Sequence, residues 1–314
     1  MFVSILLLLA GCALLYYGAE WLVEGAASLA LSLGVSRLVV GLTVVAYGTS
    51  MPELGVSVEA ALKGNDSVAI GNVVGSNICT VGLVLGVPAM ITTLPVNRNT
   101  VRLHAPIMIA GCLLLAFFLS DYVISRLEGV ILLAGLAAYT VLGFRLERRT
   151  KDAGFVDEIP ERTGQLAKDI GLIVAGIAGV LGGGHLLLEG AVDLAQRIGV
   201  SDAVIGLTVV ALGTSLPDLT ASAMAALKKH GEIAVGNALG SVMFNTYMVI
   251  SAASMTGPLD GEAFNRLDLY VMVGIAAAVL PLMLIHMQLR RWQGALLAVT
   301  YLIYVVLRWH SPAT

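Results

Sequence analysis

The sequence GLTVVAYGTSMPEL at residues 41–54 returns as GLTVVALGTSLPDL at residues 206–219. The two stretches are identical at 11 of 14 positions and stand 165 residues apart. At the same separation, GNVVGS at 71–76 pairs with GNALGS at 236–241, and EGA at 24–26 pairs with EGA at 189–191. Chance similarity between apolar helices would share leucine and alanine, not an ordered set of Gly, Thr, Ser and Pro. The chain therefore contains an internal repeat.

The composition excludes a soluble globular protein. Hydrophobic residues make up 58% of the 314 residues and charged residues only 12%, against about 25% in soluble domains. The first apolar run is longer than a signal-peptide core, so we interpret it as a retained helix. A transmembrane helix needs about 20 predominantly apolar residues. We predict ten spans, near residues 2–31, 38–62, 67–92, 103–120, 124–144, 168–193, 202–227, 232–256, 267–287 and 292–309.

Ten spans in two repeats give five spans per repeat. Because five is odd, the second repeat must enter the membrane from the opposite face, so the repeats are inverted. We therefore predict an all-α integral membrane protein with ten transmembrane helices in two inverted five-helix repeats. The first repeat is residues 1–144 with its motif region at 41–80, and the second is residues 168–314 with its motif region at 206–245. Residues 145–167 form the linker. Secondary transporters commonly have this architecture.

The distribution of Lys and Arg predicts the orientation in the membrane. Of the 18 basic residues, 13 fall in the loops of one side, including the 145–167 segment, and five fall on the other. Cytoplasmic loops carry an excess of Lys and Arg. We therefore expect a multi-pass protein of the plasma (inner) membrane, with a cytoplasmic 145–167 loop and both termini extracytoplasmic.

Proline predicts a break in the second and seventh helices. Pro52 and Pro217 lack an amide hydrogen and clash with the carbonyl four residues earlier. A break would free carbonyls such as those of Ala46 and Ala211, which a membrane tolerates only in a protein interior or a water-filled cavity. These carbonyls would join the neighbouring hydroxyl groups as hard oxygen ligands, namely those of Thr49, Ser50, Thr214 and Ser215.

Two carboxylates follow the prolines directly, Glu53 and Asp218. An ionised carboxylate near the bilayer centre costs at least ~3 kcal/mol, and no Lys or Arg lies within the repeat helices to compensate it. A bound cation or a proton must supply the countercharge. Calcium prefers six to eight oxygens, and several sodium ions could use the same ligands. The third and eighth helices are expected to add Ser76, Thr80, Ser241 and Asn245.

GTSMPE, GTSLPD, GNVVGSN and GNALGS resemble the two alpha-repeats of the calcium/cation antiporter superfamily, which includes the sodium/calcium exchangers. The resemblance implies electrogenic exchange of sodium for calcium, with the first and sixth helices sliding over the core. It implies that Glu53 and Asp218 are the central calcium ligands, joined by Thr49 and Thr214. The implied flanking sodium sites use Ser50, Ser76, Ser215 and Ser241 with the carbonyls of Ala46 and Ala211.

Two positions depart from the family pattern. Many prokaryotic members carry an amide and an acid at the two positions where this chain has Thr80 and Asn245. This chain therefore has less negative charge there, which favours fewer bound cations. The position of Asn245 is typically an aspartate in potassium-dependent exchangers, so asparagine argues against potassium coupling. Glu24 and Glu189 stand in the helices that slide in the family, and we expect them to have a structural or vestibule role.

An enzyme, a passive channel and a proton-coupled antiporter are the alternative functions. HExxH and GxSxG motifs are missing, so no enzyme activity and no cofactor are expected. Neither nucleic acid nor a protein partner is expected, only Ca²⁺, Na⁺ and the bilayer. Cys12, Cys79 and Cys112 are interpreted as packing residues. A passive cation channel uses similar oxygen ligands and is the alternative of a different class. Among antiporters, a proton is the alternative coupling ion, because two adjacent carboxylates can share one.

Overall fold

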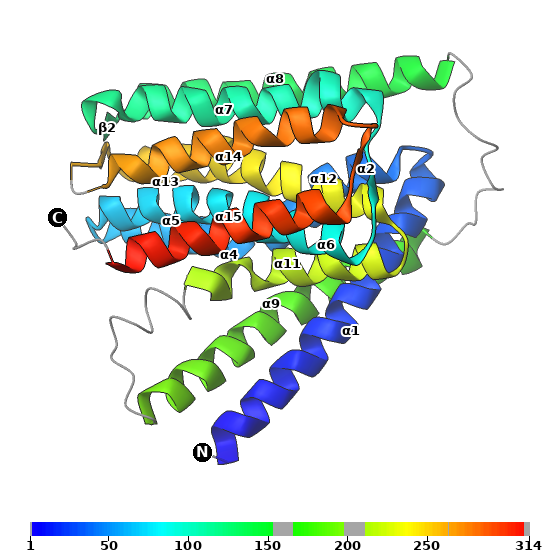
Figure 1. Ribbon diagram of the computed structural model, residues 1–314, viewed down its shortest axis with the longest axis horizontal. Helices are drawn as coiled ribbons and strands as arrows, with labels where there is room; N and C mark the ends of the chain where they lie inside the picture. The colour runs from blue at the N-terminus through cyan, green and yellow to red at the C-terminus, as the bar shows by residue number, and fades with distance from the viewer. Residues whose placement is uncertain (1, 153–165, 198–210, 263, 311–314) are drawn as a thin grey trace.

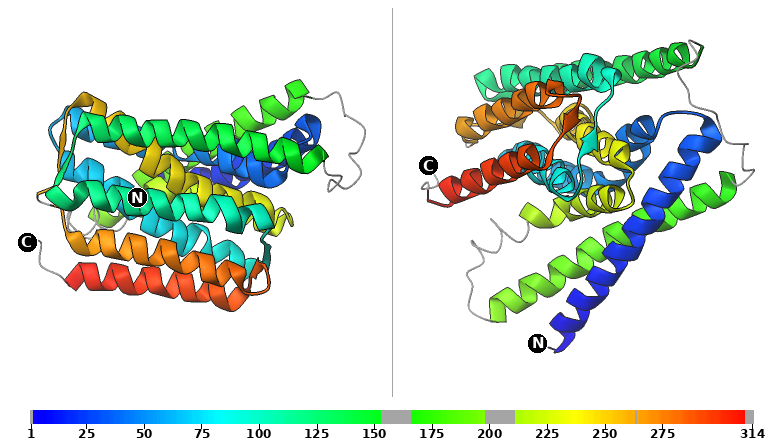
Figure 2. Two further views of the ribbon diagram at one scale, coloured as in Figure 1. Left: turned by 90° about the horizontal axis from the view of Figure 1, so that it is seen from above. Right: turned by 45° about the vertical axis from the view of Figure 1, so that its right-hand side comes forward.

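The structure is a computed structural model that describes residues 2–152, 166–197, 211–262 and 264–310. It is a bundle of helices with two very short strand pairs (Figure 1). Two long helices, α1 (Phe2–Leu33) and α9 (Leu166–Arg197), pack side by side and cross the other helices obliquely (Figure 2). The all-helical membrane fold expected from the sequence is thereby confirmed.

The second predicted span is broken. It consists of α2 (Arg37–Val40), the π-helical turn η1 (Gly41–Val45), α3 (Ala46–Thr49) and α4 (Met51–Leu62). The axis bends by 46° between Thr49 and Met51. Ser50 at the bend has φ −89° and ψ 11°, outside the helical region, and Pro52 follows in the first turn of α4. The expected break in this helix is confirmed.

The corresponding break in the seventh span was expected at Pro217 and is not found there. Helix α11 runs from Ala211 to Leu227 with Pro217 inside it. The proline removes one backbone hydrogen bond, but membrane helices tolerate this loss when neighbouring helices and hydroxyl groups compensate for it. Residues 202–210 of the predicted span lie outside the described residues.

The third and eighth spans have matching interruptions. The third consists of α5 (Asp66–Cys79), the π-helical turn η2 (Thr80–Val84) and α6 (Gly86–Ile91). The eighth consists of α12 (Gly231–Met243), the π-helical turn η6 (Phe244–Val249) and α13 (Ile250–Thr256). π-Helical turns are rare and occur frequently at functional sites. Both of these turns lie at the positions predicted to supply ion ligands.

The remaining helices cover this centre on one side (Figure 1). They are the π-helical turn η3 (Thr100–His104), α7 (Ala105–Phe118), the 3₁₀ turn η4 (Leu119–Asp121), α8 (Arg126–Asp152), α14 (Arg266–Leu284) and α15 (Arg291–His310). Strand β1 (Leu94–Pro95) pairs antiparallel with β4 (Gln288–Leu289), and β2 (Val123–Ile124) pairs with β3 (Leu259–Asp260). Adding 165 to β1 and β2 gives β3 and β4, so each strand pair joins the two repeats in the same way.

Seven described helices are long and apolar enough to cross a membrane, or eight if the bent pair at Ser50 is one span. Helix α15 coincides with the tenth predicted span but is not among these seven, and the seventh predicted span lies partly outside the described residues. The ten-span count and the inverted topology therefore stay predictions. The length and apolar composition of the described helices indicate a multi-pass membrane protein.

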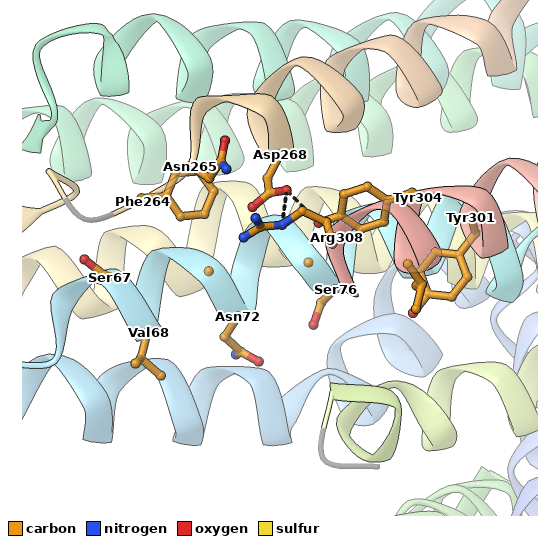
Figure 3. A pocket seen from close by; sticks show the side chains of 13 residues that line it. Ser67, Val68, Asn72, Ser76, Phe264, Asn265, Asp268, Tyr301, Tyr304 and Arg308 are labelled. Atoms are coloured by element: carbon orange, nitrogen blue, oxygen red, sulfur yellow. Dashed lines mark hydrogen bonds and ion pairs between the residues drawn. The ribbon is translucent and has the colours of Figure 1, made fainter. Parts of the chain in front are cut away.

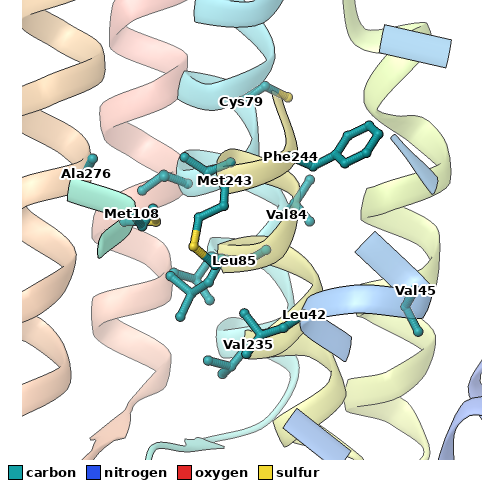
Figure 4. Close-up of a cluster of buried hydrophobic side chains, with 14 of the residues drawn as sticks. Leu42, Val45, Cys79, Val84, Leu85, Met108, Val235, Met243, Phe244 and Ala276 are labelled. Atoms are coloured by element: carbon teal, nitrogen blue, oxygen red, sulfur yellow. The ribbon is translucent and has the colours of Figure 1, made fainter. Parts of the chain in front are cut away.

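The outer surface is apolar, and the buried polar side chains lie among apolar ones at the centre. Exposed side chains include Phe117, Leu127 and Leu307, as expected for a surface that faces lipid. The span Gly231–Thr256 has 94% of its most apolar stretch buried, whereas that of Arg126–Gly143 has 22% buried. The apolar cluster around Met243, Phe244 and Leu85 packs the motif helices together (Figure 4). The polar residues of the motifs lie in this buried centre.

Glycine permits the close approach of α1 and α9. Cβ atoms added at Gly18 and Gly183 would lie 2.6 Å from backbone nitrogen atoms of the opposite helix. Small residues at helix interfaces let membrane helices approach backbone to backbone. Gly11, Gly18 and Gly25 correspond to Gly176, Gly183 and Gly190 at the 165-residue separation, so both repeats contribute the same contact surface.

Candidate ion-binding site

The motif residues from both repeats meet at the buried centre of the bundle. Helix α4 packs against α5 and η6, and α11 packs against α12 and η2. The two sets of contacts are equivalent, because α4, α5 and η6 of one set correspond in the other repeat to α11, α12 and η2 of the other set. Eleven of the twelve predicted site residues have described side chains, and all of these are buried except Thr214, which is half-buried. The buried ones are Ala46, Thr49, Ser50, Glu53, Ser76, Thr80, Ser215, Asp218, Ser241 and Asn245.

Asp218 is hydrogen-bonded within this cluster. Its side chain is 1% exposed, and Ser241 Oγ donates to Oδ1 at 3.1 Å. Ser50 Oγ, from the other repeat, lies at 3.5 Å from Oδ2. The hydroxyl of Ser50 therefore faces the acid across the repeat interface instead of bonding back to its own helix. These contacts bring Ser50, Asp218 and Ser241 together.

Glu53 lies in the same cluster without such support. Its side chain is fully buried, and Asp218 is its charged neighbour. Neither carboxylate oxygen of Glu53 has a hydrogen-bond partner among the described residues. The described ion pairs include no Lys or Arg with either acid. Buried polar atoms without partners are rare in native proteins, so this carboxylate requires an explanation.

Further unpartnered oxygen atoms come from the two π-helical turns. Thr80 Oγ1 and the side-chain amide of Asn245 are buried and have no hydrogen-bond partner in the described part of the chain. Ser215 Oγ lies beside the thiol of Cys79. Cys79 thus borders the site, a position that its spacing in the sequence does not indicate. Together with Glu53, these groups leave several oxygen atoms available to a cation.

The threonines differ between the repeats. Thr49 Oγ1 is 2.8 Å from the Val45 carbonyl, 3.2 Å from Asn237 Oδ1 and 3.4 Å from the Ala46 carbonyl, so three acceptors compete for its proton. Thr214 is half-buried on α11. The Ala46 carbonyl was expected to be freed by the break, which is wrong: it accepts from Ser50 N at 3.0 Å, because the α3 turn closes before the bend. Ala211 begins α11, at the limit of the described residues.

Two asparagines were not identified as functional from the sequence. Asn72 Nδ2 donates to the Glu53 carbonyl at 3.2 Å, and Asn237 Nδ2 donates to the Asp218 carbonyl at 3.2 Å. In the sequence, the GN pairs at 71–72 and 236–237 contribute only to the repeat and to the family resemblance. Their recurrence in both repeats was the signal that could have identified the asparagines.

A cavity of about 510 Å³ lies beside the cluster, between α5, α14 and α15 (Figure 3). Asn72 and Ser76 line it on the side of the cluster. On the opposite wall, Asp268 pairs with Arg308 at 3.0 Å and accepts from Tyr304 at 2.9 Å. The cavity therefore brings open space to one edge of the cluster while its own charges are paired.

Glu24 has a structural partner, as expected. Lys228, at the end of α11, contacts both Glu24 and Glu20 on α1, the latter at 2.7 Å. Its counterpart Lys63 pairs at 2.5 Å with Glu59 of its own helix. Glu189 on α9 is an exposed residue 4.0 Å from His185. Lys228 therefore joins the oblique α1–α9 pair to the rest of the bundle.

The cluster has the chemistry of a hard-cation site. Two carboxylates, hydroxyl oxygens and an amide oxygen are the ligands that Ca²⁺ and similar ions prefer. Transition metals prefer imidazole and thiolate donors, whereas this cluster offers carboxylate, hydroxyl and amide oxygens. The fold and this cluster define the class: a multi-pass membrane protein with a buried, acidic, oxygen-rich interior.

Within that class, the chain belongs to the sodium/calcium exchanger family. The family described as "Sodium/calcium exchanger protein" matches residues 3–145 and again residues 168–310. The putative antiporter CaxA of Alkalimonas amylolytica is 35% identical, over 99% of this chain and 100% of its own. The sodium/calcium exchanger MaX1 of Methanosarcina acetivorans is 31% identical, over 97% and 98%.

A solved structure has the same fold. The sodium-calcium exchanger NCX_Mj, soaked with zero Na⁺ and Ca²⁺, superposes with a TM-score of 0.86 at 31% sequence identity. The match covers 98% of this chain and 99% of that chain. The resemblance to the calcium/cation antiporter superfamily is thereby confirmed, and the family is one of membrane transporters.

Proposed function

We propose that this protein is a secondary active antiporter that exchanges sodium for calcium by alternating access. The observation that carries the proposal is the Glu53 carboxylate, which is fully buried beside Asp218 without a hydrogen-bond or ion-pair partner among the described residues. Two adjacent buried carboxylates are compensated by one Ca²⁺ or by monovalent cations. Ions that compete for one site and that bind alternative conformations differently produce exchange.

The site that we propose comprises Glu53 and Asp218 as central calcium ligands. Thr49, Thr214 and the π-turn residues Thr80 and Asn245 surround them. The sodium ions occupy flanking positions at Ser50, Ser76, Ser215 and Ser241, with the carbonyls of Ala46 and Ala211. A carbonyl oxygen has two lone pairs, so the bond from Ser50 N to the Ala46 carbonyl leaves one for a cation. The burial of the two acids and the four serines, and their origin in both repeats, support this assignment. No residue in it requires a resident cofactor.

The proton is the second candidate for the coupling ion. A buried carboxyl group without partners can also be neutralised by protonation, and Glu53 is such a group. Sodium is preferred because the cluster contains more oxygen atoms than one proton requires. The proposed orientation has the basic 145–167 segment in the cytoplasm, in agreement with the excess of Lys and Arg on that side.

Ion flux into proteoliposomes tests the proposal. Purified protein is reconstituted, and calcium uptake is measured under an outward sodium gradient, an outward potassium gradient and a pH gradient, each applied alone. Sodium-driven uptake is expected. Uptake driven only by the pH gradient would replace sodium by the proton. Uptake at channel rates without any imposed gradient would refute antiport and favour a passive channel.

A further inference from the structure

The two asparagines of the GN pairs make the same unusual set of contacts. Asn72 Nδ2 donates to the Glu53 carbonyl at 3.2 Å and to Ser57 Oγ at 2.9 Å. Asn237 Nδ2 donates to the Asp218 carbonyl at 3.2 Å and to Ser222 Oγ at 2.9 Å. The repeats thus preserve the asparagine, the serine and both distances, although the acid itself differs.

The chemistry of these contacts is specific to a side-chain amide. The amide nitrogen carries two hydrogens in a fixed plane, so a single group can serve a carbonyl and a hydroxyl together. Each asparagine bonds to the main-chain carbonyl of its acid and not to a carboxylate oxygen. A donor aimed at the carboxylate would compete with the cation for those oxygens. The amide therefore holds the acid in place without occupying it.

Each asparagine also lies one helical turn before a serine of the proposed site. Ser76 follows Asn72 on α5, and Ser241 follows Asn237 on α12. In the second repeat, Ser241 Oγ donates to Asp218 Oδ1 at 3.1 Å. Helix α12 thus holds the backbone of Asp218 through Asn237 and also supplies the hydroxyl oxygen of Ser241 next to its carboxylate. The hydrogen bond from the asparagine amide therefore fixes how far the carboxylate of the acid can be from the serine hydroxyl.

The two asparagines differ in one respect. Asn237 Oδ1 lies 3.2 Å from Thr49 Oγ1 of the first repeat, so Asn237 joins three elements, α3, α11 and α12. Asn72 makes no such bond to Thr214 within the described residues. Asn237 is fully buried, whereas Asn72 borders the cavity beside α5. A loss of Asn237 should therefore disturb the site more than a loss of Asn72.

We propose that Asn72 and Asn237 are positioning residues that set the size of the oxygen cluster and so determine which divalent cations it accepts. This inference rests on the proposed cation transport. Selectivity among hard cations depends on cavity size, ligand number and site rigidity. Loosening either acid relative to its serine should relax the preference for Ca²⁺ over the larger Sr²⁺.

The experiment measures KM for Ca²⁺ and for Sr²⁺ separately in proteoliposomes and compares their ratio. Asn237→Leu removes both donors at nearly constant volume and should raise KM for Ca²⁺ about tenfold, as substitutions of outer-shell partners of a metal site typically weaken binding. KM for Sr²⁺ should rise less, so the ratio changes. Asn72→Leu should change it less. Ser222→Ala removes the other partner of the same amide and should leave the ratio unchanged within experimental error.

Asn77→Val is the matched control for the loss of a buried asparagine. Asn77 lies on α5 next to Ser76 but bonds to Thr246 at 2.9 Å, and its counterpart in the second repeat is Val242. This variant should retain the ratio of the unmodified protein. A fall in maximal rate at a constant KM ratio in Asn237→Leu would overturn the proposal, because it would assign the amide a packing role only.

A second variant covers the case in which Asn237→Leu does not fold. Asn237→Gln keeps both donors but displaces them by one methylene group, so it should also change the ratio. An unchanged ratio and unchanged affinities in this variant would equally overturn the positioning role. Absence of cation transport by the unmodified protein would instead refute the proposed function, which keeps the two failures distinct.

Discussion

Neutralising the two acids one at a time should have opposite effects on the stability of the ion-free protein. Glu53→Gln removes a buried carboxylate that accepts no hydrogen bond among the described residues. An ionised side chain there costs about 3 kcal/mol or more, so its replacement should leave the protein as stable or make it more stable. Asp218→Asn instead removes the charged acceptor of Ser241. A hydrogen bond to a charged group contributes about 1.5–3 kcal/mol, so this variant should lose stability.

Both variants should lose stabilisation by calcium. At a calcium concentration of about 100 times Kd, binding stabilises the native protein by about 2.7 kcal/mol. A carboxylate roughly 2.4 Å from Ca²⁺ contributes about 14 kcal/mol of Coulomb energy at an effective dielectric constant of about 20, most of which replaces lost hydration. If one tenth of it is net, about 1.4 kcal/mol, the affinity falls tenfold and the stabilisation at the same concentration falls by about half.

Thermal unfolding in detergent, with and without excess calcium, measures both effects. Magnesium at the same concentration is the control for nonspecific binding of a divalent cation, because Mg²⁺ demands a smaller octahedral site. Calcium stabilisation of Glu53→Gln equal to that of the unmodified protein would refute the assignment of Glu53 as a ligand. Equal destabilisation of both ion-free variants would refute the asymmetry between the two acids.

Three further predictions concern residues outside the acidic pair. Gly183→Ala places a Cβ atom 2.6 Å from a backbone nitrogen of α1, so it should weaken α1–α9 packing and slow exchange. The Cβ atom of Gly182→Ala meets nothing within 4 Å. This control should be neutral or stabilise the protein by up to ~1 kcal/mol in thermal unfolding. Lys228→Gln should lower thermal stability by up to ~1 kcal/mol through the loss of two partly exposed ion pairs, and Lys63→Gln, whose pair is exposed, should have almost no effect. Burial, and to a lesser extent nearby cations, lowers the pKa of His230 below its ordinary 6.5. The unfolded chain therefore binds the proton first, and the stability of the native protein falls as the pH drops below about 6.5. His230→Asn should reduce this loss of stability in unfolding measured from pH 7 to 5.

Local rules explain which parts of the fold could be predicted. Pro52 lies in the first turn of α4, where the chain bends by 46°, as its missing amide hydrogen predicts. The same residue type at Pro217 does not end α11. The difference cannot be read from GTSMPE and GTSLPD, because it depends on whether neighbouring groups compensate the lost hydrogen bond. The Ala46 carbonyl likewise has a partner that the sequence motif does not reveal.

The membrane class, the 165-residue repeat and the oxygen-rich composition of the site follow from the order of residues alone, because hydrophobicity and repetition are properties of consecutive residues. The difference between the two acids follows from helix packing. Thr49 contacts Asn237 across 188 positions, and Ser50 contacts Asp218 across 168. Such contacts depend on how helices from different repeats pack, and two nearly identical motifs give no indication of it. Packing therefore surrounds Asp218 with hydroxyl donors and leaves the Glu53 carboxylate available to an ion.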